Sequence, residues 1–87
     1  MYDARPDVMS VVHAHAEDVL PFTISSVPFR PVIQNAADMA ATIPVWDIAD
    51  QFGTDADFLV RNLAQGRDLA RTLATNRLAL MRSHGFV

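Results

Sequence analysis

Short apolar runs, each about the length of one strand, restrict what this chain can fold into. Hydrophobic residues make up 51% of its 87 residues, yet no run is long enough to form a membrane-spanning helix. Such runs are typical of strands that are buried on both faces of a sheet. A domain of this size buries only somewhat more than about 60% of its unfolded surface. We therefore predict strands covered by helices, in a chain that belongs to a larger protein or an obligate oligomer.

The expected elements alternate between strand and helix. In order, they are a strand at 8–13, a helix at 16–25, an extended piece at 29–33, helical turns at 35–42, a strand at 43–48, a helix at 57–73 and a strand at 78–82. Pro6 keeps Arg5 out of helical geometry before the first strand. This order predicts an α/β fold built from layers of helix and sheet.

The helix expected at 57–73 has apolar residues at helical spacing. Thr54 or Asp55 is expected to cap its start, and Asn76 to follow it in a left-handed conformation. Its charged residues lie off the apolar stripe and are expected on a solvated face: Arg67, Asp68 and Arg71.

The net charge of the chain and its lack of cysteine exclude several classes of protein. The net charge is −3 and no lysine is present, so no basic patch is available for nucleic acid or an anionic membrane surface. The absence of cysteine excludes disulfides and is compatible with the reducing cytoplasm, where we expect the protein to act. The polar N-terminus does not resemble a signal peptide.

Three histidines stand where a metal site would need them. His13 and His15 are two residues apart, so on a strand they share a face at a separation of about 6.6 Å. His84 ends a second apolar run, and Gly85 after it permits close backbone approach. Three imidazoles at metal–nitrogen distances of about 2.0–2.1 Å would leave positions open for catalysis. The alternative is that these histidines have no ligand; the third one favours a metal site.

Five segments of the chain resemble the class II aldolase/adducin family. They are Arg5–Val8, Val11–His15, Leu80–Gly85, Pro28–Ile33 and Ile43–Ile48, and the last two are most similar to its decarboxylase branch, in particular to the hydroxymethylpyridine-dicarboxylate decarboxylases. The resemblance implies a three-layer α/β/α fold with a mainly antiparallel sheet, often assembled as a homotetramer.

The resemblance also implies an activity: metal-dependent carbon–carbon bond cleavage through an enolate, as a decarboxylase or aldolase. The divalent ion, foremost zinc or manganese, would be held by His13, His15 and His84. The substrate would be a small molecule, either a sugar phosphate or a carboxylated carbonyl or aromatic compound. Two alternatives stay open, a sugar-phosphate aldolase or epimerase and a non-catalytic adducin-like interaction module. The complete histidine set favours an enzyme.

The chain also departs from the family pattern. The family's catalytic acid precedes the His-x-His segment by more residues than this chain has, so we expect 1–87 to be a partial domain, truncated at both ends, with the acid–base group upstream of Met1. Glu17 and Asp18 could replace it, but helix-dipole stabilisation explains them better. Arg82 is expected to share a strand face with His84 and to meet a substrate carboxylate. Ser83 stands where glycine is frequent.

Overall fold

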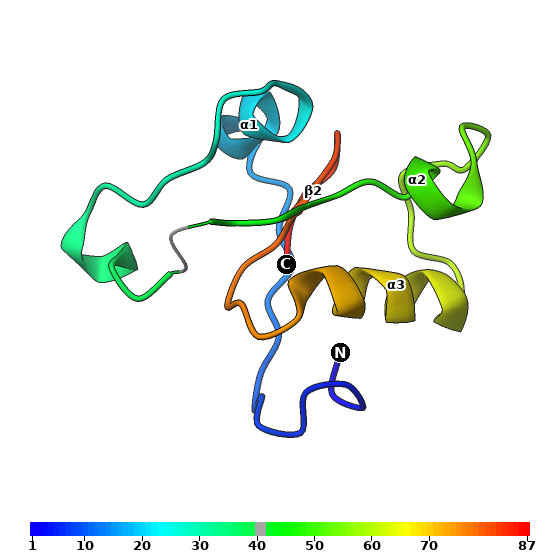
Figure 1. Ribbon diagram of the computed structural model, residues 1–87, viewed down its shortest axis with the longest axis horizontal. Helices are drawn as coiled ribbons and strands as arrows, with labels where there is room; N and C mark the ends of the chain where they lie inside the picture. Colours follow the sequence, from blue (N-terminus) through cyan, green and yellow to red (C-terminus); the bar gives the residue numbers. More distant parts are fainter. Residues whose placement is uncertain (40–41) are drawn as a thin grey trace.

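The computed structural model describes residues 1–39 and 42–87, which form an α/β arrangement around a small sheet (Figure 1). Its elements are the 3-10 helix η1 (Glu17–Val19), α1 (Leu20–Ile24), the 3-10 helix η2 (Gln34–Ala36), β1 (Val45–Trp46), α2 (Ala49–Phe52), α3 (Leu63–Leu73), β2 (Leu80–Met81) and β3 (Gly85–Phe86). Among the described residues, no helix has the length and apolar character needed to cross a membrane.

The sheet is mixed, with β2 between its two neighbours. β1 pairs with β2 in parallel, with Trp46 opposite Met81, and β2 pairs with β3 antiparallel, with Met81 opposite Gly85. β1 begins after Pro44, whose carbonyl oxygen accepts from the Leu80 N–H at 2.9 Å. Each strand has only two residues, and both residues of β2 pair with β1 on one side and with β3 on the other.

Neither the strand expected at 8–13 nor the extended piece expected at 29–33 joins the sheet. Residues 8–13 make no ladder, and Met9 and Val12 are 91% and 66% exposed. The prediction failed because an apolar run becomes a strand only beside a partner, and the isolated bridge from Ala14 to Phe86 lies one residue beyond this segment. The extended piece at 29–33 is likewise unpaired, and Val32 is 91% exposed.

The other boundaries are shorter than predicted. The helix expected at 16–25 is split into η1 and α1, and the strand expected at 43–48 keeps only β1 before the chain turns into α2. The strand expected at 78–82 keeps only β2. Of the helical turns expected at 35–42, η2 provides one at Gln34–Ala36, and residues 40 and 41 lie outside the described part of the chain.

α3 begins later than expected, at Leu63, and neither Thr54 nor Asp55 caps it. Asn62 is the N-cap, and its side-chain oxygen accepts from the Gln65 N–H at 3.0 Å. The Gln65 side chain in turn accepts from the N–H of Arg61 at 2.8 Å. This reciprocal pairing is a variant of the capping box, and it fixes the start of the helix more strongly than the apolar period does.

α3 ends at Leu73, where Ala74 rather than Asn76 takes a positive φ, of 48°. The Arg5 guanidinium donates to the carbonyl oxygens of Ala74 at 2.8 Å and Asn76 at 3.2 Å. A cation at this position satisfies carbonyls that the helix end leaves free. The N-terminal segment is thereby tied to the end of α3.

The core forms where α3 packs beside β1 (Figure 1). Its central side chains are Trp46, Ile48, Leu69 and Met81. The Trp46 indole N–H donates to the Asp68 carboxylate at 2.8 Å, and Arg71 donates to the other carboxylate oxygen at 2.8 Å. Asp68 is only 8% exposed, so placing it on a solvated face was wrong. Hydrogen bonds from Arg71 first, and then from Trp46, lower the pKa of Asp68.

Candidate metal centre

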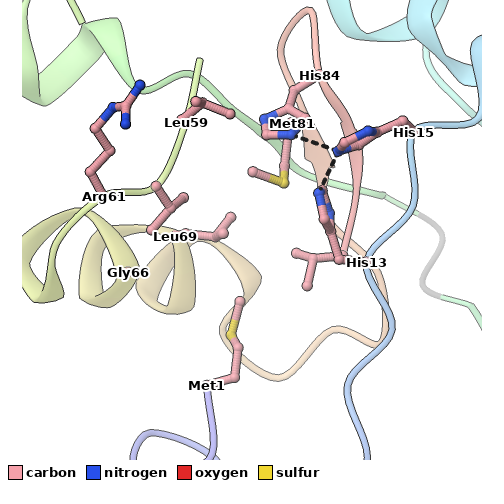
Figure 2. A pocket seen from close by; sticks show the side chains of 11 residues that line it. Met1, His13, His15, Leu59, Arg61, Gly66, Leu69, Met81 and His84 are labelled. Carbon is pink, nitrogen blue, oxygen red and sulfur yellow. Dashed lines mark hydrogen bonds between the residues drawn. The ribbon is translucent and has the colours of Figure 1, made fainter. Parts of the chain in front are cut away.

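The structure brings the three histidine rings together, as their spacing predicts (Figure 2). The Nε2 atoms of His13 and His15 are 2.9 Å apart, and those of His84 and His15 are also 2.9 Å apart. One nitrogen from each ring lies within 4.8 Å of the other two. Two ligands of one ion are about 2.9 to 3.3 Å apart when metal–nitrogen bonds are about 2.0–2.1 Å long. The pair His13–His15 and the pair His84–His15 therefore have the spacing that two ligands of one divalent ion require.

The backbone bridge between Ala14 and Phe86 brings the first two histidines to the third. The Ala14 N–H donates to the Phe86 carbonyl oxygen at 3.2 Å, and the Phe86 N–H donates to the Ala14 carbonyl oxygen at 3.0 Å. Because side chains alternate along extended backbone, His13 and His15 project to the same side of this bridge. On the other side of the bridge, the paired residue is Phe86, which lies two positions after His84.

Gly85 makes this crossing possible. A Cβ atom at Gly85 would lie 2.1 Å from the Ala14 carbonyl oxygen and 3.1 Å from the Cα of His15. Only a residue without a side chain permits the two backbones to approach so closely. The close backbone approach expected at Gly85 is therefore confirmed.

His84 is presented by a tight turn after β2. The turn is closed by a hydrogen bond from the His84 N–H to the Met81 carbonyl oxygen at 3.0 Å. Ser83, its third residue, has a φ of 55°. This is a left-handed conformation that glycine adopts more readily than serine. The Ser83 N–H donates to the Thr23 hydroxyl at 3.0 Å.

Backbone carbonyls orient two of the imidazoles. The Nδ1–H of His13 donates to the carbonyl oxygen of Phe86 at 2.8 Å, and the Nδ1–H of His84 donates to that of Phe58. A neutral imidazole that carries its proton on Nδ1 has its lone pair on Nε2. A single proton on His15 Nε2 can satisfy only one of the two contacts that this atom makes. The set therefore presents more lone pairs than protons, and this arrangement fits a cation.

The surroundings of His84 favour its neutral form. Burial lowers the pKa of His84, the hydrogen bond to Phe58 partly opposes this effect, and the neighbouring His13 and His15 lower the pKa further. His84 is partly buried, whereas the other two histidines are exposed. Metal ligation requires a neutral imidazole, so these effects act in the direction that binding needs.

A cavity of about 750 Å³ opens beside the three rings (Figure 2). Its remaining walls are mostly apolar and come from Met1, Leu59, Val60, Arg61, Gly66, Leu69, Met81 and Val87. Arg61 is the charged residue among them, and its Nε donates to the Asp57 carboxylate at 2.8 Å. Sequence reasoning missed Arg61, because an arginine four residues after an aspartate is typical of a surface ion pair.

Comparison with known proteins identifies the family of the chain. The Class II Aldolase and Adducin N-terminal domain family matches residues 1–87. The chain belongs to this family. It is 38% identical over 96 residues to decarboxylase tropJ of Talaromyces stipitatus, in an alignment that covers 99% of this chain and 36% of the relative. The chain thus spans about a third of the length of the curated relative that it matches. The family resemblance inferred from the sequence is confirmed.

In this class II aldolase domain, Arg82 lies outside the cavity. β2 ends at Met81, so Arg82 and His84 lie in the turn rather than on one strand face, contrary to the spacing argument. The Nε of Arg82 is 3.2 Å from an oxygen of Asp47. The suggested contact of Arg82 with a substrate carboxylate stays a prediction, and it would require Arg82 to leave Asp47.

The acidic residues after the His-x-His segment lie in the first turn of η1. Glu17 and Asp18 are both exposed. Within residues 1–39 and 42–87, the potential ligand group contains the three histidines and no carboxylate. The imidazoles, the fixed backbone carbonyls and the apolar walls are thus what this chain contributes to chemistry.

Proposed function

We propose that the protein carrying this chain is a divalent-metal-dependent carbon–carbon lyase, a decarboxylase or aldolase, and that His13, His15 and His84 hold its metal ion. The observation that carries this proposal is the convergence of three Nε2 atoms, with two of the rings oriented by backbone carbonyls through Nδ1. Membership of the class II aldolase family and the similarity to a decarboxylase support it.

The residues of the site suit this chemistry. When bound, a zinc or manganese ion supplies a Lewis acid that stabilises negative charge on a substrate oxygen as a carbon–carbon bond breaks. The three imidazoles are neutral ligands and leave the charge of the ion undiminished. The carbonyls of Phe86 and Phe58 hold two rings in the tautomer that directs Nε2 inward. Leu59, Leu69 and Met81 form an apolar wall beside the site.

Proton transfer requires a further group. In the described part of the chain, the candidate ligand group includes no carboxylate. We therefore assign the acid–base residue to a segment of the protein upstream of Met1. The finer architecture belongs to the same proposal: a three-layer α/β/α domain assembled as a homo-oligomer, with a tetramer as the expected state.

The choice among family members follows from the relative and from the site. The name of the curated relative favours a decarboxylase that acts on a carboxylated carbonyl or aromatic compound over a sugar-phosphate aldolase or epimerase. An adducin-like interaction module has no use for three imidazoles with oriented Nε2 lone pairs. We therefore place that alternative second.

The test is metal content together with release of carbon dioxide. The purified protein is expected to contain about one equivalent of divalent metal, to lose decarboxylation of aromatic and β-keto carboxylates on chelation, and to regain it with zinc or manganese. His13→Ala, His15→Ala and His84→Ala should each lose metal and activity, whereas Glu17→Gln, a nearby exposed substitution, should retain both. Unchanged metal content in the histidine variants would contradict the proposal.

A further inference from the structure

Thr23 connects the two parts of the chain that carry the histidines. It lies in α1, the helix that follows His15, and it is only 1% exposed. Its hydroxyl donates to the carbonyl oxygen of Leu20 at 2.7 Å and accepts from the Ser83 N–H at 3.0 Å. Because a hydroxyl has one proton and two lone pairs, both contacts can be made at once. The second contact spans 60 residues of sequence and reaches the residue before His84.

The Ser83 N–H belongs to the central peptide of the turn from Met81 to His84. That peptide is oriented so that Ser83 has a φ of 55°, which is disfavoured for a residue with a Cβ atom. Turning the central peptide over would return Ser83 to negative φ and convert the turn to a commoner type. An acceptor fixed on the Ser83 N–H opposes this change, and Thr23 supplies it.

The contact between Thr23 and Ser83 complements the bridge between Ala14 and Phe86, because the two connections lie on opposite sides of His15 and of His84 in the sequence. His15 lies between Ala14 and Thr23 in sequence, and His84 lies between Ser83 and Phe86. Each of these two ligands is therefore flanked by both connections, one made by backbone alone and the other by the Thr23 side chain. Together the connections fix the position of one imidazole relative to the other.

We propose that Thr23 is a positioning residue of the metal site, whose buried hydroxyl holds the turn 81–84 so that the Nε2 atoms of His84 and His15 meet before an ion binds. The inference rests on the proposed metal-dependent function and extends it to a residue that touches neither the imidazoles nor the ion. Substitution of a residue that orients a metal ligand typically weakens metal binding by about 10- to 100-fold.

The experiment compares T23V, which keeps the shape of the side chain and removes the hydroxyl, with T23S, which keeps the hydroxyl. Cobalt(II) is the probe: its dissociation constant is measured by competition with a chelating indicator, and its visible absorption reports the ligand geometry. T23V is expected to bind cobalt at least about tenfold more weakly with an altered spectrum. T23S is expected to retain the affinity and spectrum of the unmutated protein.

The substitution S83G separates positioning from packing. Glycine accepts the positive φ without help, so T23V/S83G should recover part of the cobalt affinity that T23V loses. A packing defect at Thr23 would not respond to a change at Ser83. In the metal-free, unmutated protein, the Ser83 amide is expected to be protected from hydrogen exchange, a measurement that does not depend on the folding of any variant.

The outcomes are distinct. If the unmutated protein binds no cobalt, the proposed function is wrong and this inference falls with it. If it binds cobalt but T23V has the same affinity and spectrum, the inference alone is wrong. Loss of affinity in T23V without recovery in T23V/S83G, or an unprotected Ser83 amide, also overturns it.

Discussion

The Cβ position of Gly85 lies 2.1 Å from the carbonyl oxygen of Ala14, so any side chain at residue 85 would collide with the segment that carries His13 and His15. The obstacle is backbone, which cannot rotate away as a side-chain tip can. The site between the two segments thus requires glycine at residue 85. The sequence shows this residue only as a glycine that follows a histidine.

Gly85→Ala is expected to separate the two segments. The methyl group would push Ala14 away from Phe86, move His13 and His15 relative to His84, and weaken metal binding by more than about tenfold. It should also lower the free energy of unfolding by more than about 1 kcal/mol, since the native backbone does not accommodate the new atom. Isothermal titration with zinc and chemical denaturation measure the two effects.

Gly66→Ala is the matched control and a prediction in its own right. Gly66 also lines the cavity, but a Cβ atom there would meet only Cγ1 of Val60, at 3.8 Å, an ordinary contact distance. Because Gly66 lies inside α3, alanine should stabilise the protein by about 0.5–1 kcal/mol and leave metal affinity unchanged. Equal loss of zinc binding in the two alanine variants would show that the cavity wall, and not the crossing at Gly85, controls the site.

Asn62→Ala should destabilise α3. The Asn62 side chain accepts from the Gln65 N–H, and removing an N-cap of this kind costs about 1 kcal/mol of stability. Asn76→Ala provides the comparison, because the contact of Asn76 with Arg5 uses its backbone carbonyl, which alanine retains. The stability of the two variants is compared by their denaturation midpoints, which report stability directly as long as the m-values are unchanged. A larger loss in Asn76→Ala than in Asn62→Ala would mean that the helix is stabilised mainly from its other end.

How far the sequence predicted this structure depends on whether the signal was local. The spacing of His13 and His15 and the glycine after His84 are local patterns, and they led to the correct convergence. The strand expected at 8–13 failed because strand formation needs a neighbouring ladder, which an apolar run does not reveal. The capping box at Asn62 and Gln65 was a readable local signal that the hydrophobic period concealed.

Other contacts leave no local trace in the sequence. The hydrogen bond from Ser83 to Thr23 joins residues 60 positions apart, and a threonine in a short helix has no mark of that partner. The same is true of Asp68, which is buried because the Trp46 indole N–H needs an acceptor across the boundary between α3 and β1. Buried polar groups of this kind follow from the assembled fold, since each must find a hydrogen-bond partner.

Asp68 should make stability depend on pH in the acid range. Its pKa in the folded protein is lowered, by Arg71 first and Trp46 second, whereas an unfolded aspartate has a pKa near about 3.9. The unfolded state therefore binds protons more readily, so this contribution is fully present above the unfolded pKa and is lost as the pH falls through the folded pKa. Asp68→Asn lacks that titration. Its deficit in unfolding free energy should shrink from pH 6 to about pH 3, as measured by urea denaturation, and a constant deficit would refute this account.

Metal binding should stabilise the fold as well as the site. The histidines come from opposite ends of the chain, so an ion that ligates all three joins the segment at 13–15 to the turn that carries His84. An ion that binds the folded state alone, at a free concentration of 100 times its dissociation constant, adds about 2.7 kcal/mol to the free energy of unfolding. Thermal unfolding with zinc, with manganese and with a chelator should show this increase in the unmutated protein. His84→Ala should show little or none, since two exposed imidazoles two residues apart can ligate equally in the unfolded chain. The same metal-induced rise in both proteins would mean that the ion binds elsewhere, and that the convergence of the three rings does not create its site.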